Sequence, residues 1–417
     1  MGEKSVTRQL PKNYWKTVVF TFCLGWVVIW IYRAMLSPIY SEIQGTIGTQ
    51  TNAAMGLIAS CYFFGYTGMQ IPSGFLVDKF GQKKVLIPGF IIFALGAFSI
   101  ASAPTISFIY LGSVMAGIGC GTYYGAAFSL TAEHVPPEKK GISTAIVNSG
   151  SALGMIIGMT GSSFVVKTMG ANWRMMPIIS GSLIALLVVW FCIAIKEGDK
   201  GKRLQGAAAK VEVVEEETKK GVSLISANMI SCYILYFCTC YAYYMIVTWL
   251  PKFLETERGI SGGMIGLVVS MISVTAVPGA LFFARRSDKQ RDKKAFIIIG
   301  LELSAFVLIA TAMLAPTAGV LALILLLYGF LGKMAVDPVL ISYVSDKASK
   351  KTMATTLGMF NFFGMSSSIV APAVTGFIID KTGSGELGFY IGAALLIVGT
   401  ILFLLFNAKA LFKKKAA

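Results

Sequence analysis

Charge is scarce in this sequence. Of its 417 residues, 13% are charged and 55% are apolar, whereas a soluble globular domain usually carries about 25% charged residues. The apolar residues gather in repeated runs of roughly 20, each long enough for a helix to cross the hydrocarbon core of a bilayer. These two features exclude an ordinary soluble domain and predict an all-α membrane protein.

Residues that hold metals or act as nucleophiles are also few. His134 is the only histidine, and all seven cysteines lie inside apolar runs, with no CxxC pair beside a histidine. No nucleophile–base pair is visible either. We therefore expect no enzyme activity, no metal and no cofactor.

Acidic residues are outnumbered by basic ones, 20 against 36, which gives a net charge of +16. A nucleic-acid-binding protein would carry such charge as a patch on a folded surface. Here the cations lie in the tails and in alternate loops, and the loops 44–51, 103–105 and 315–318 have none. By the positive-inside rule, both termini are expected on the cytoplasmic side of the cell inner (plasma) membrane. We expect no nucleic-acid partner and a monomer in the bilayer.

The apolar runs predict twelve transmembrane helices. Their expected ranges are 15–43, 52–77, 85–103, 106–132, 142–168, 173–195, 223–250, 261–284, 295–314, 317–345, 353–379 and 387–408. The longest polar break divides them six and six, and its mixed charges are typical of a flexible surface linker. The expected organisation is an N-terminal six-helix bundle (1–195), a cytoplasmic linker (196–222) and a C-terminal six-helix bundle (223–417).

A charged hinge follows the second helix of each half. Asp78–Lys79 with Lys83–Lys84 is matched, about half a chain length later, by Asp288–Lys289 with Lys293–Lys294 at the same internal spacing. The segment Gly74–Lys84 has the pattern Gly-x-Leu-x-Asp-Lys-x-Gly-x-Lys-Lys. It resembles the signature loop of the major facilitator superfamily, and the resemblance covers nearly the whole chain. It implies two pseudo-symmetric six-helix bundles around a central cavity that opens alternately to each side.

The hinge also predicts a gate. A carboxylate at the end of a helix can accept hydrogen bonds from the N-terminal N–H groups of a neighbouring helix and from Lys or Arg across the bundle interface. Such a cluster would hold the cytoplasmic side shut and would break when that side opens. The alternative is that these charges only mark topology. The candidate gate residues are Asp78, Lys79, Lys83, Asp288 and Glu133.

Several short motifs are similar to the anion:cation symporter family, which moves organic acids and related anions. They are Tyr32–Ser37, Asn172–Arg174, Thr248–Pro251, Ala371–Gly376 and Asp380–Ser384. The sequence departs from that family at Tyr32, where an aspartate is usual, at Cys120, where a glutamate is frequent, and at Ser113, where an arginine is common. The first two are the family's usual proton-titrating groups, so the resemblance does not imply proton coupling through them.

Three charges fall inside predicted spans, where each costs about 2.5–3.5 kcal/mol on insertion scales. They are Arg33 just past the middle of the first span, and Lys333 and Asp337 in the middle of the tenth. In the resembled fold, spans one, four, seven and ten line the cavity. Arg33 and Lys333 would then come from opposite halves and could hold an anion between them, with arginine giving a planar two-pronged contact to a carboxylate.

Asp337 lies one helical turn from Lys333, so the two side chains can meet. A permanent pair would leave one net positive charge and suit a monoanion. If Asp337 takes up a proton, Lys333 is freed and a second carboxylate can be held, which would make Asp337 the proton-coupling residue. The alternative is an ion pair that only lowers the cost of insertion.

Other cavity candidates are polar side chains on the same spans. Ser37 and Tyr40 share the helical face of Arg33 by spacing. The remaining candidates are Tyr124, Tyr243 and Asn361, for which packing or helix–helix hydrogen bonding is the alternative role.

The sequence therefore predicts a secondary transporter of a small organic anion, a mono- or dicarboxylate, working by alternating access. Proton symport and exchange for a counter-anion both fit. The runner-up is an exchanger of sugar phosphates or phosphate, which would also need paired cations. A multidrug exporter fits less well because it would need an apolar cavity with acidic residues, and a non-transporting receptor would bind without accumulating its ligand.

Overall fold

The computed structural model describes residues 13–136, 139–196, 223, 225–348 and 353–411, and every regular element of this part is helical. The predicted linker 196–222 lies outside the described residues apart from Lys196, as do the ends of both tails. The first group of helices is α1 (Tyr14–Met35), η1 (Ser37–Ile39), α2 (Tyr40–Ile47), α3 (Asn52–Phe80), α4 (Gln82–Ala101), α5 (Ile106–Gly121), α6 (Tyr123–His134), α7 (Lys140–Ser162), the π-helical η3 (Ser163–Thr168) and α8 (Met175–Ala194). The second group is α10 (Ala227–Thr256), α11 (Met264–Lys289), η4 (Arg291–Lys293), α12 (Lys294–Ala312), α13 (Ala318–Leu331), α14 (Lys333–Lys347), α15 (Met353–Thr382) and α16 (Gly385–Leu411).

The all-helical membrane fold predicted from the apolar runs is confirmed. Eleven segments of the described chain are long and apolar enough to span a bilayer. The predicted span that is not among these eleven is the second, 52–77, which corresponds to α3, a helix of 29 residues that packs on α5 and α15. Several predicted single spans are built of two consecutive elements, since α5 gives way to α6 at Thr122 and α13 to α14 at Gly332.

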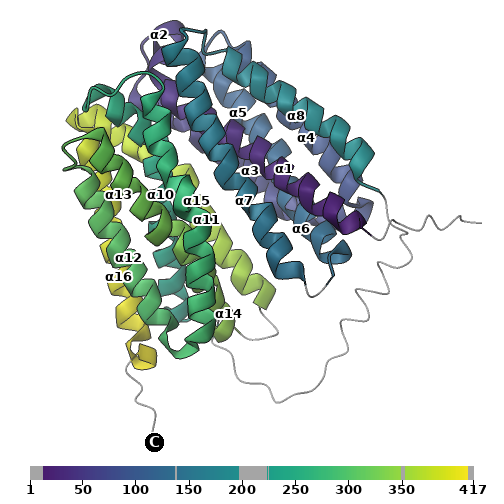
Figure 1. Ribbon diagram of the computed structural model, residues 1–417, viewed down its shortest axis with the longest axis vertical. Helices are drawn as coiled ribbons and strands as arrows, with labels where there is room; N and C mark the ends of the chain where they lie inside the picture. Colours follow the sequence, from purple (N-terminus) through teal and green to yellow (C-terminus); the bar gives the residue numbers. More distant parts are fainter. Residues whose placement is uncertain (1–12, 137–138, 197–222, 224, 349–352, 412–417) are drawn as a thin grey trace, which may run out of the picture.

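Figure 1 shows the two groups as two bundles, purple to teal and green to yellow. Contacts between them run mainly through α3 against α15, α7 against α11, and η1 against α10. Glycine permits the closest packing inside the first bundle. A Cβ added to Gly150, Gly154 or Gly158 of α7 would meet the backbone carbonyl oxygens of α1 at 2.3–2.7 Å. The boundaries of the bundles stay a prediction.

The two ends of the molecule differ. We call the end where α1 begins and α16 finishes the terminus side, and the other end the distal side (Figure 1). At the distal side, polar contacts join the two bundles. Asp380 at the end of α15 accepts hydrogen bonds from the backbone N–H groups of Asn52 (2.7 Å) and Ala53 (2.8 Å), so it caps the N-terminus of α3.

A second group of contacts completes this closure. Lys167 of η3 forms ion pairs with Glu42 of α2 (2.8 Å) and with Glu255 of α10. Lys252 of α10 donates to the side chains of Gln44 (2.6 Å) and Asn52 (2.7 Å). We call Glu42, Lys167, Lys252, Glu255 and Asp380 the distal seal. It holds the bundles together on this side, and the sequence analysis did not predict it.

Candidate functional site

Arg33 lies near the end of α1 with its guanidinium enclosed by aromatic rings. Its Nε donates to the hydroxyl of Tyr62 at 2.8 Å. The guanidinium carbon lies 4.4 Å from the ring centroid of Tyr66 and 5.2 Å from that of Trp30. In the described part of the chain no carboxylate forms an ion pair with Arg33. Aromatic faces attract a cation but leave its charge in place, so Arg33 carries a positive charge that no described carboxylate neutralises.

A cavity of about 50 Å³ lies beside Arg33. Its walls come from α1, η1, α2, α3 and α5 of the first bundle and from α10 of the second. Ser37 and Tyr40, both predicted to accompany Arg33, line it with Tyr62, Tyr244 and Thr248. Its volume is that of a few water molecules, far below the roughly 300–1,000 Å³ of typical ligand sites. A ligand larger than a few water molecules therefore fits only if the lining side chains or helices move.

Lys333 begins α14, directly after the break at Gly332. Its side chain is largely buried and its Nζ lies 2.5 Å from Oδ2 of Asp337, so the pair predicted from the one-turn spacing is present. The other carboxylate oxygen, Oδ1, is buried without a partner, and the Asp337 side chain is 21% exposed. The ammonium also lies 5.5 Å from the ring of Tyr243. Lys333 is thus neutralised by Asp337 in this structure and is not free to hold an anion.

Aromatic rings connect the two cations. Phe63 of α3 lies over Arg33 at 5.4 Å and packs edge-on against Tyr244 of α10, with 4.8 Å between the ring centroids. Tyr244 in turn contacts Tyr243 at 5.5 Å, and Tyr243 faces Lys333. Arg33 and Lys333 therefore lie on either side of a tyrosine pair from α10. An anion that contacts both would have to displace at least one of these rings.

The remaining binding candidates do not line the cavity, although Tyr124 borders the cluster through Trp26, whose ring centroid lies 5.8 Å from the guanidinium carbon of Arg33. Tyr124 is half exposed at the start of α6, with its ring edge-on to Trp26 at 6.5 Å. Asn361 of α15 is exposed and donates to Oε1 of Gln70 on α3 at 3.1 Å, which links the bundles nearer the terminus side. Neither lines the cavity beside Arg33.

The predicted gate residues are not assembled on the terminus side. Asp78 and Asp288 are exposed and form no ion pair with any described residue. Lys79 lies over the adjacent ring of Phe80, and Lys83 donates to the carbonyl of Cys192 in its own bundle. Glu133 accepts a long hydrogen bond of 3.4 Å from Gln82. The distal seal is therefore formed in this structure, whereas the five predicted gate residues on the terminus side do not contact one another across the two bundles. The distal side is closed, and the terminus side is not held shut by these residues.

Sequence reasoning missed one further intramembrane charge, Glu302 in the middle of α12. It is completely buried, and its Oε1 lies 2.5 Å from the hydroxyl of Thr239 on α10. The signal was present, because Leu301–Glu302–Leu303 places a carboxyl inside the predicted span 295–314. The sequence gives no comparable signal for the distal seal. Its residues lie near the ends of the predicted spans, where charged side chains are common.

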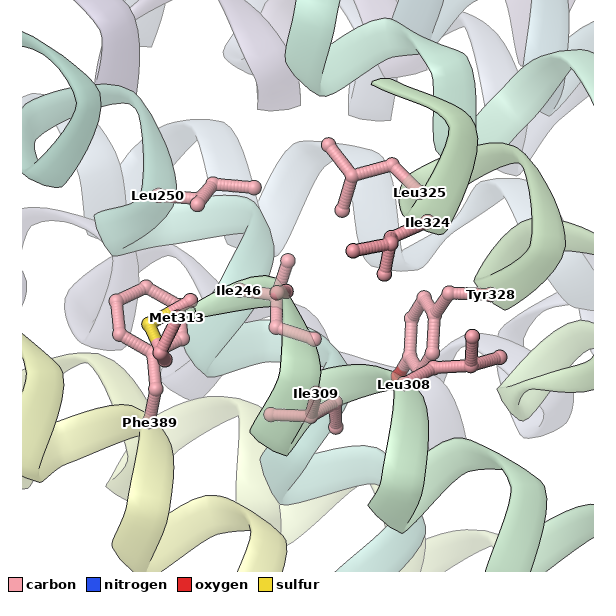
Figure 2. Close-up of a pocket in the computed structure, with 10 residues that line it drawn as sticks. Ile246, Leu250, Leu308, Ile309, Met313, Ile324, Leu325, Tyr328 and Phe389 are labelled. Atoms are coloured by element: carbon pink, nitrogen blue, oxygen red, sulfur yellow. The ribbon is translucent and has the colours of Figure 1, made fainter. Parts of the chain in front are cut away.

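A second cavity, of about 10 Å³, lies between α10, α12, α13 and α16 of the second bundle (Figure 2). Its lining is apolar apart from Tyr328, with side chains such as Ile246, Leu325 and Phe389 pointing into it. It holds no charged group and has room for about one water molecule. We regard it as a packing void. Among the described residues no cluster of His, Cys, Asp and Glu could hold a metal ion.

Comparison with known proteins identifies the fold. The family model described as Major Facilitator Superfamily matches residues 19–372 and 232–416. The crystal structure of a bacterial homolog to the human lysosomal transporter Spinster, in an inward-facing and occupied conformation, superimposes with a TM-score of 0.79 at 15% identity, covering 96% of this chain and 98% of that one. The inward-facing and unoccupied form of that homolog gives a TM-score of 0.74 at 14% identity, covering 96% and 97%.

Curated relatives match over almost their whole length. A protein named probable sulfoacetate transporter SauU from Cupriavidus necator is 26% identical over 94% of this chain and 93% of its own length. The hexuronate transporter of Bacillus subtilis is 24% identical, with 94% of both chains covered. A protein named probable galactarate/D-glucarate transporter GudP from Escherichia coli is 26% identical, covering 99% of this chain and 98% of its own.

Proposed function

The chain belongs to the major facilitator superfamily, and from this premise we propose that it is a secondary transporter of a small organic anion, a mono- or dicarboxylate, that works by alternating access. The relatives named above carry sulfoacetate, hexuronates and galactarate or D-glucarate, all of them organic acids. Transport, rather than catalysis, is the activity of this family.

The observation that carries the proposal is Arg33. A guanidinium inside the membrane costs about 2.5–3.5 kcal/mol unless it is paired, yet Arg33 has no described carboxylate partner and lies against a cavity walled by both bundles. Tyr62 fixes its orientation through the Nε hydrogen bond, and Nη2 makes a long contact of 3.9 Å with Sγ of Cys120, so Nη1 and the second hydrogen of Nη2 are left for a carboxylate. An anion bound there would contact α1 and α10 together and so favour one arrangement of the bundles over another.

Lys333 supplies the second positive charge only when it leaves Asp337. In the paired state the central region offers one uncompensated cation and suits a monoanion. Protonation of Asp337 would release Lys333 for a second carboxylate, which suits a dicarboxylate and couples transport to a proton. Exchange of one anion for another, with the pair intact, is the other driving mode that these residues support.

The terminus side is the cytoplasmic side in this proposal. Its helix ends carry Lys79 in the last turn of α3, Lys83 and Lys84 at the start of α4, and a cationic cluster where α11 is followed by α12, while the distal loops carry few cations. The structure then corresponds to a state closed to the outside. The division into bundles 1–195 and 223–417, joined by 196–222, is part of the same proposal.

The experiment is a binding and uptake screen on purified protein. D-Glucarate, D-glucuronate, sulfoacetate, a hexose phosphate and a quaternary ammonium salt are tested by thermal shift, and the best ligand is then followed into proteoliposomes. We expect an organic acid to stabilise the protein and to accumulate. Saturable binding without accumulation would indicate a receptor, and preference for the ammonium salt would contradict an anion site.

Arg33→Ala is the matching variant. It removes charge-assisted hydrogen bonds worth about 1.5–3 kcal/mol in total, so we expect the affinity for the preferred acid to fall roughly 10- to 150-fold. Arg286→Ala, which removes an exposed arginine from the terminus side of α11, is the control and should bind as the wild type does. Normal binding by Arg33→Ala would remove Arg33 from the site.

A further inference from the structure

Glu302 is a buried carboxyl group that the proposed transport site does not use. It lies in the middle of α12 with 0% of its surface exposed. Its Oε1 contacts the Thr239 hydroxyl at 2.5 Å, and its Oε2 has no hydrogen-bond partner. No lysine or arginine of the described residues forms an ion pair with it.

A count of hydrogens indicates which form of the carboxyl is present. The Thr239 oxygen lies 2.9 Å from the carbonyl oxygen of Leu235, one turn back on α10, and 2.5 Å from Glu302. A carbonyl oxygen has no hydrogen to give, and a hydroxyl has one. If Thr239 donates to Leu235, both contacts are satisfied only when Glu302 is protonated and donates to Thr239.

Burial favours the same form. A carboxylate here would leave a charged oxygen, Oε2, without a donor or counter-ion among the described residues, which is far more costly than an unpaired carbonyl oxygen. The titratable groups that face Glu302 do not change this. They are Cys238 and Cys240 on α10, Tyr328 on α13 and Asp337 on α14. Between Glu386 and Asn407, α16 has no charged residue to offer.

Glu302 lies close to the Lys333–Asp337 pair. Thr239 falls three residues after Tyr236 and four before Tyr243, so the three share one face of α10. Tyr236 and Tyr243 both face the Lys333 ammonium, at 5.9 and 5.5 Å from their ring centroids. The hydroxyl that holds Glu302 therefore lies between the two rings that flank the lysine.

We propose that Glu302 is a proton-binding site of the transport cycle, the fully buried member of a two-carboxyl pair whose partly buried member is Asp337 and whose one cation is Lys333. The inference rests on the proposed transport function and identifies the proton as a second cargo. In this structure Lys333 pairs with the Asp337 carboxylate and the proton is on Glu302.

The proton balance of the step is simple. When Lys333 turns from Asp337 to Glu302, the O–H bond of Glu302 breaks, an O–H bond forms on Asp337, and the ammonium stays protonated. The net charge of the three groups stays zero throughout. The Asp337 side chain is 21% exposed, so in this proposal it exchanges the proton with the surroundings, whereas Glu302, with 0% of its surface exposed, keeps it out of contact with water. Lys333 can turn because it begins α14 next to the helix break at Gly332.

The first test needs no substrate. Infrared spectra of the purified protein at neutral pH should contain the carbonyl stretch of a protonated carboxyl, and Glu302→Gln should lack it. Glu133→Gln, an exposed acid in the other bundle, is the control and should retain the band. Persistence of the band in Glu302→Gln would overturn the assignment. Thr239→Val keeps the acid and should shift the band, which tests the site if Glu302→Gln fails to fold.

The second test measures coupling in proteoliposomes with D-glucarate, D-glucuronate or sulfoacetate, whichever the wild type transports. Glu302→Gln should lose accumulation driven by a pH gradient while exchanging anions within about twofold of the wild-type rate. The coupling role would be overturned if Glu302→Gln accumulated the anion as the wild type does. It would also be overturned if transport by the wild-type protein were the same with and without a pH gradient. If the wild-type protein transports none of these acids, the proposed function is contradicted. The infrared test of the protonated Glu302 does not depend on that outcome.

Discussion

At the scale of single residues, the central site contrasts two cations in different surroundings. Arg33 has aromatic faces and one tyrosine hydroxyl around it and no described acidic partner, whereas Lys333 is held by Asp337. The flat guanidinium can stack between rings and still present parallel N–H groups, which an ammonium cannot do. In the proposed transport site, the arginine is therefore a fixed anion contact, and the lysine is a contact whose availability depends on Asp337.

Asp337→Asn tests this dependence. The variant leaves the Lys333 ammonium buried without its counter-ion, so we expect a loss of unfolding free energy of about 3–5 kcal/mol in the absence of ligand. The preferred organic acid should then stabilise Asp337→Asn more than it stabilises the wild type, because it replaces the missing carboxylate. Thermal unfolding with and without the acid measures both effects. Accumulation driven by a pH gradient should be lost and counterflow kept; survival of that accumulation would remove Asp337 from coupling.

At the scale of helices, α3 and α15 control the distal side. They are antiparallel, and they approach so closely that a Cβ added to Gly56 would meet the carbonyl oxygen of Pro372 at 2.2 Å. The carboxylate of Asp380 at the end of α15 then reaches the N-terminus of α3. Glycine at the crossing and an acid at the helix end are therefore both required for the closure seen here.

Gly56→Ala should prevent that close approach. The methyl group has backbone atoms in front of it and cannot be accommodated by turning a side chain, so we expect the distal side to open and transport to fall. Gly68→Ala in the same helix is the control, because nothing lies within 4 Å of the added atom. Reaction of a cysteine introduced at Thr248, in a background without the native cysteines, reports the opening from the distal side. Equal reactivity of this cysteine in Gly56→Ala and Gly68→Ala would show that the close contact of α3 with α15 at Gly56 is not needed to close the distal side.

Asp380→Asn should weaken the cap on α3. The change removes the negative charge beside the N-terminus of α3 and one of the two acceptor oxygens, together worth about 0.5–2 kcal/mol, so the population of distally closed molecules should fall by about 2- to 30-fold relative to open ones. Distances between spin labels on the distal ends of α3 and α15 measure this ratio. An unchanged ratio would mean that Lys167 and Lys252 hold the seal by themselves.

At the scale of the whole molecule, the two ends of α3 suggest opposite latches. Its N-terminus is capped by Asp380 in this structure, while Asp78 near its C-terminal end is exposed and unpaired among the described residues. If Asp78 latches the terminus side when that side closes, the two aspartates stabilise opposite states of one equilibrium.

This arrangement predicts compensation. Asp78→Asn should favour the distally closed state and Asp380→Asn the distally open one, so the double variant should return toward the wild-type distribution. The test measures distances between spin labels on α3 and α15, at the distal ends and at the terminus-side ends. They are compared in the wild type, the two single variants and the double variant. If the changes in the closed-to-open ratio do not cancel in the double variant, or if Asp78→Asn does not change the ratio, Asp78 is not a latch. Its charge would then only help to set the orientation of the helices in the membrane.

The sequence by itself determined the elements and the charges that matter. Apolar runs of about 20 residues leave the chain no choice but membrane helices, because a backbone in lipid must satisfy its own hydrogen bonds. The insertion cost singled out Arg33, Lys333 and Asp337, and the spacing of four residues predicted the Lys333–Asp337 pair, since both depend only on local order along one helix.

Only the tertiary structure decided which groups meet across helices. The aromatic cage of Arg33, the tyrosines that separate it from Lys333, the Thr239–Glu302 contact and the cap of Asp380 on α3 all join segments far apart in the chain. The sequence contains no local spacing that predicts such contacts, because they follow from how helices pack. For the same reason it could not indicate which side of the molecule is closed: that depends on which of two sets of long-range contacts forms, and both are encoded in the same residues.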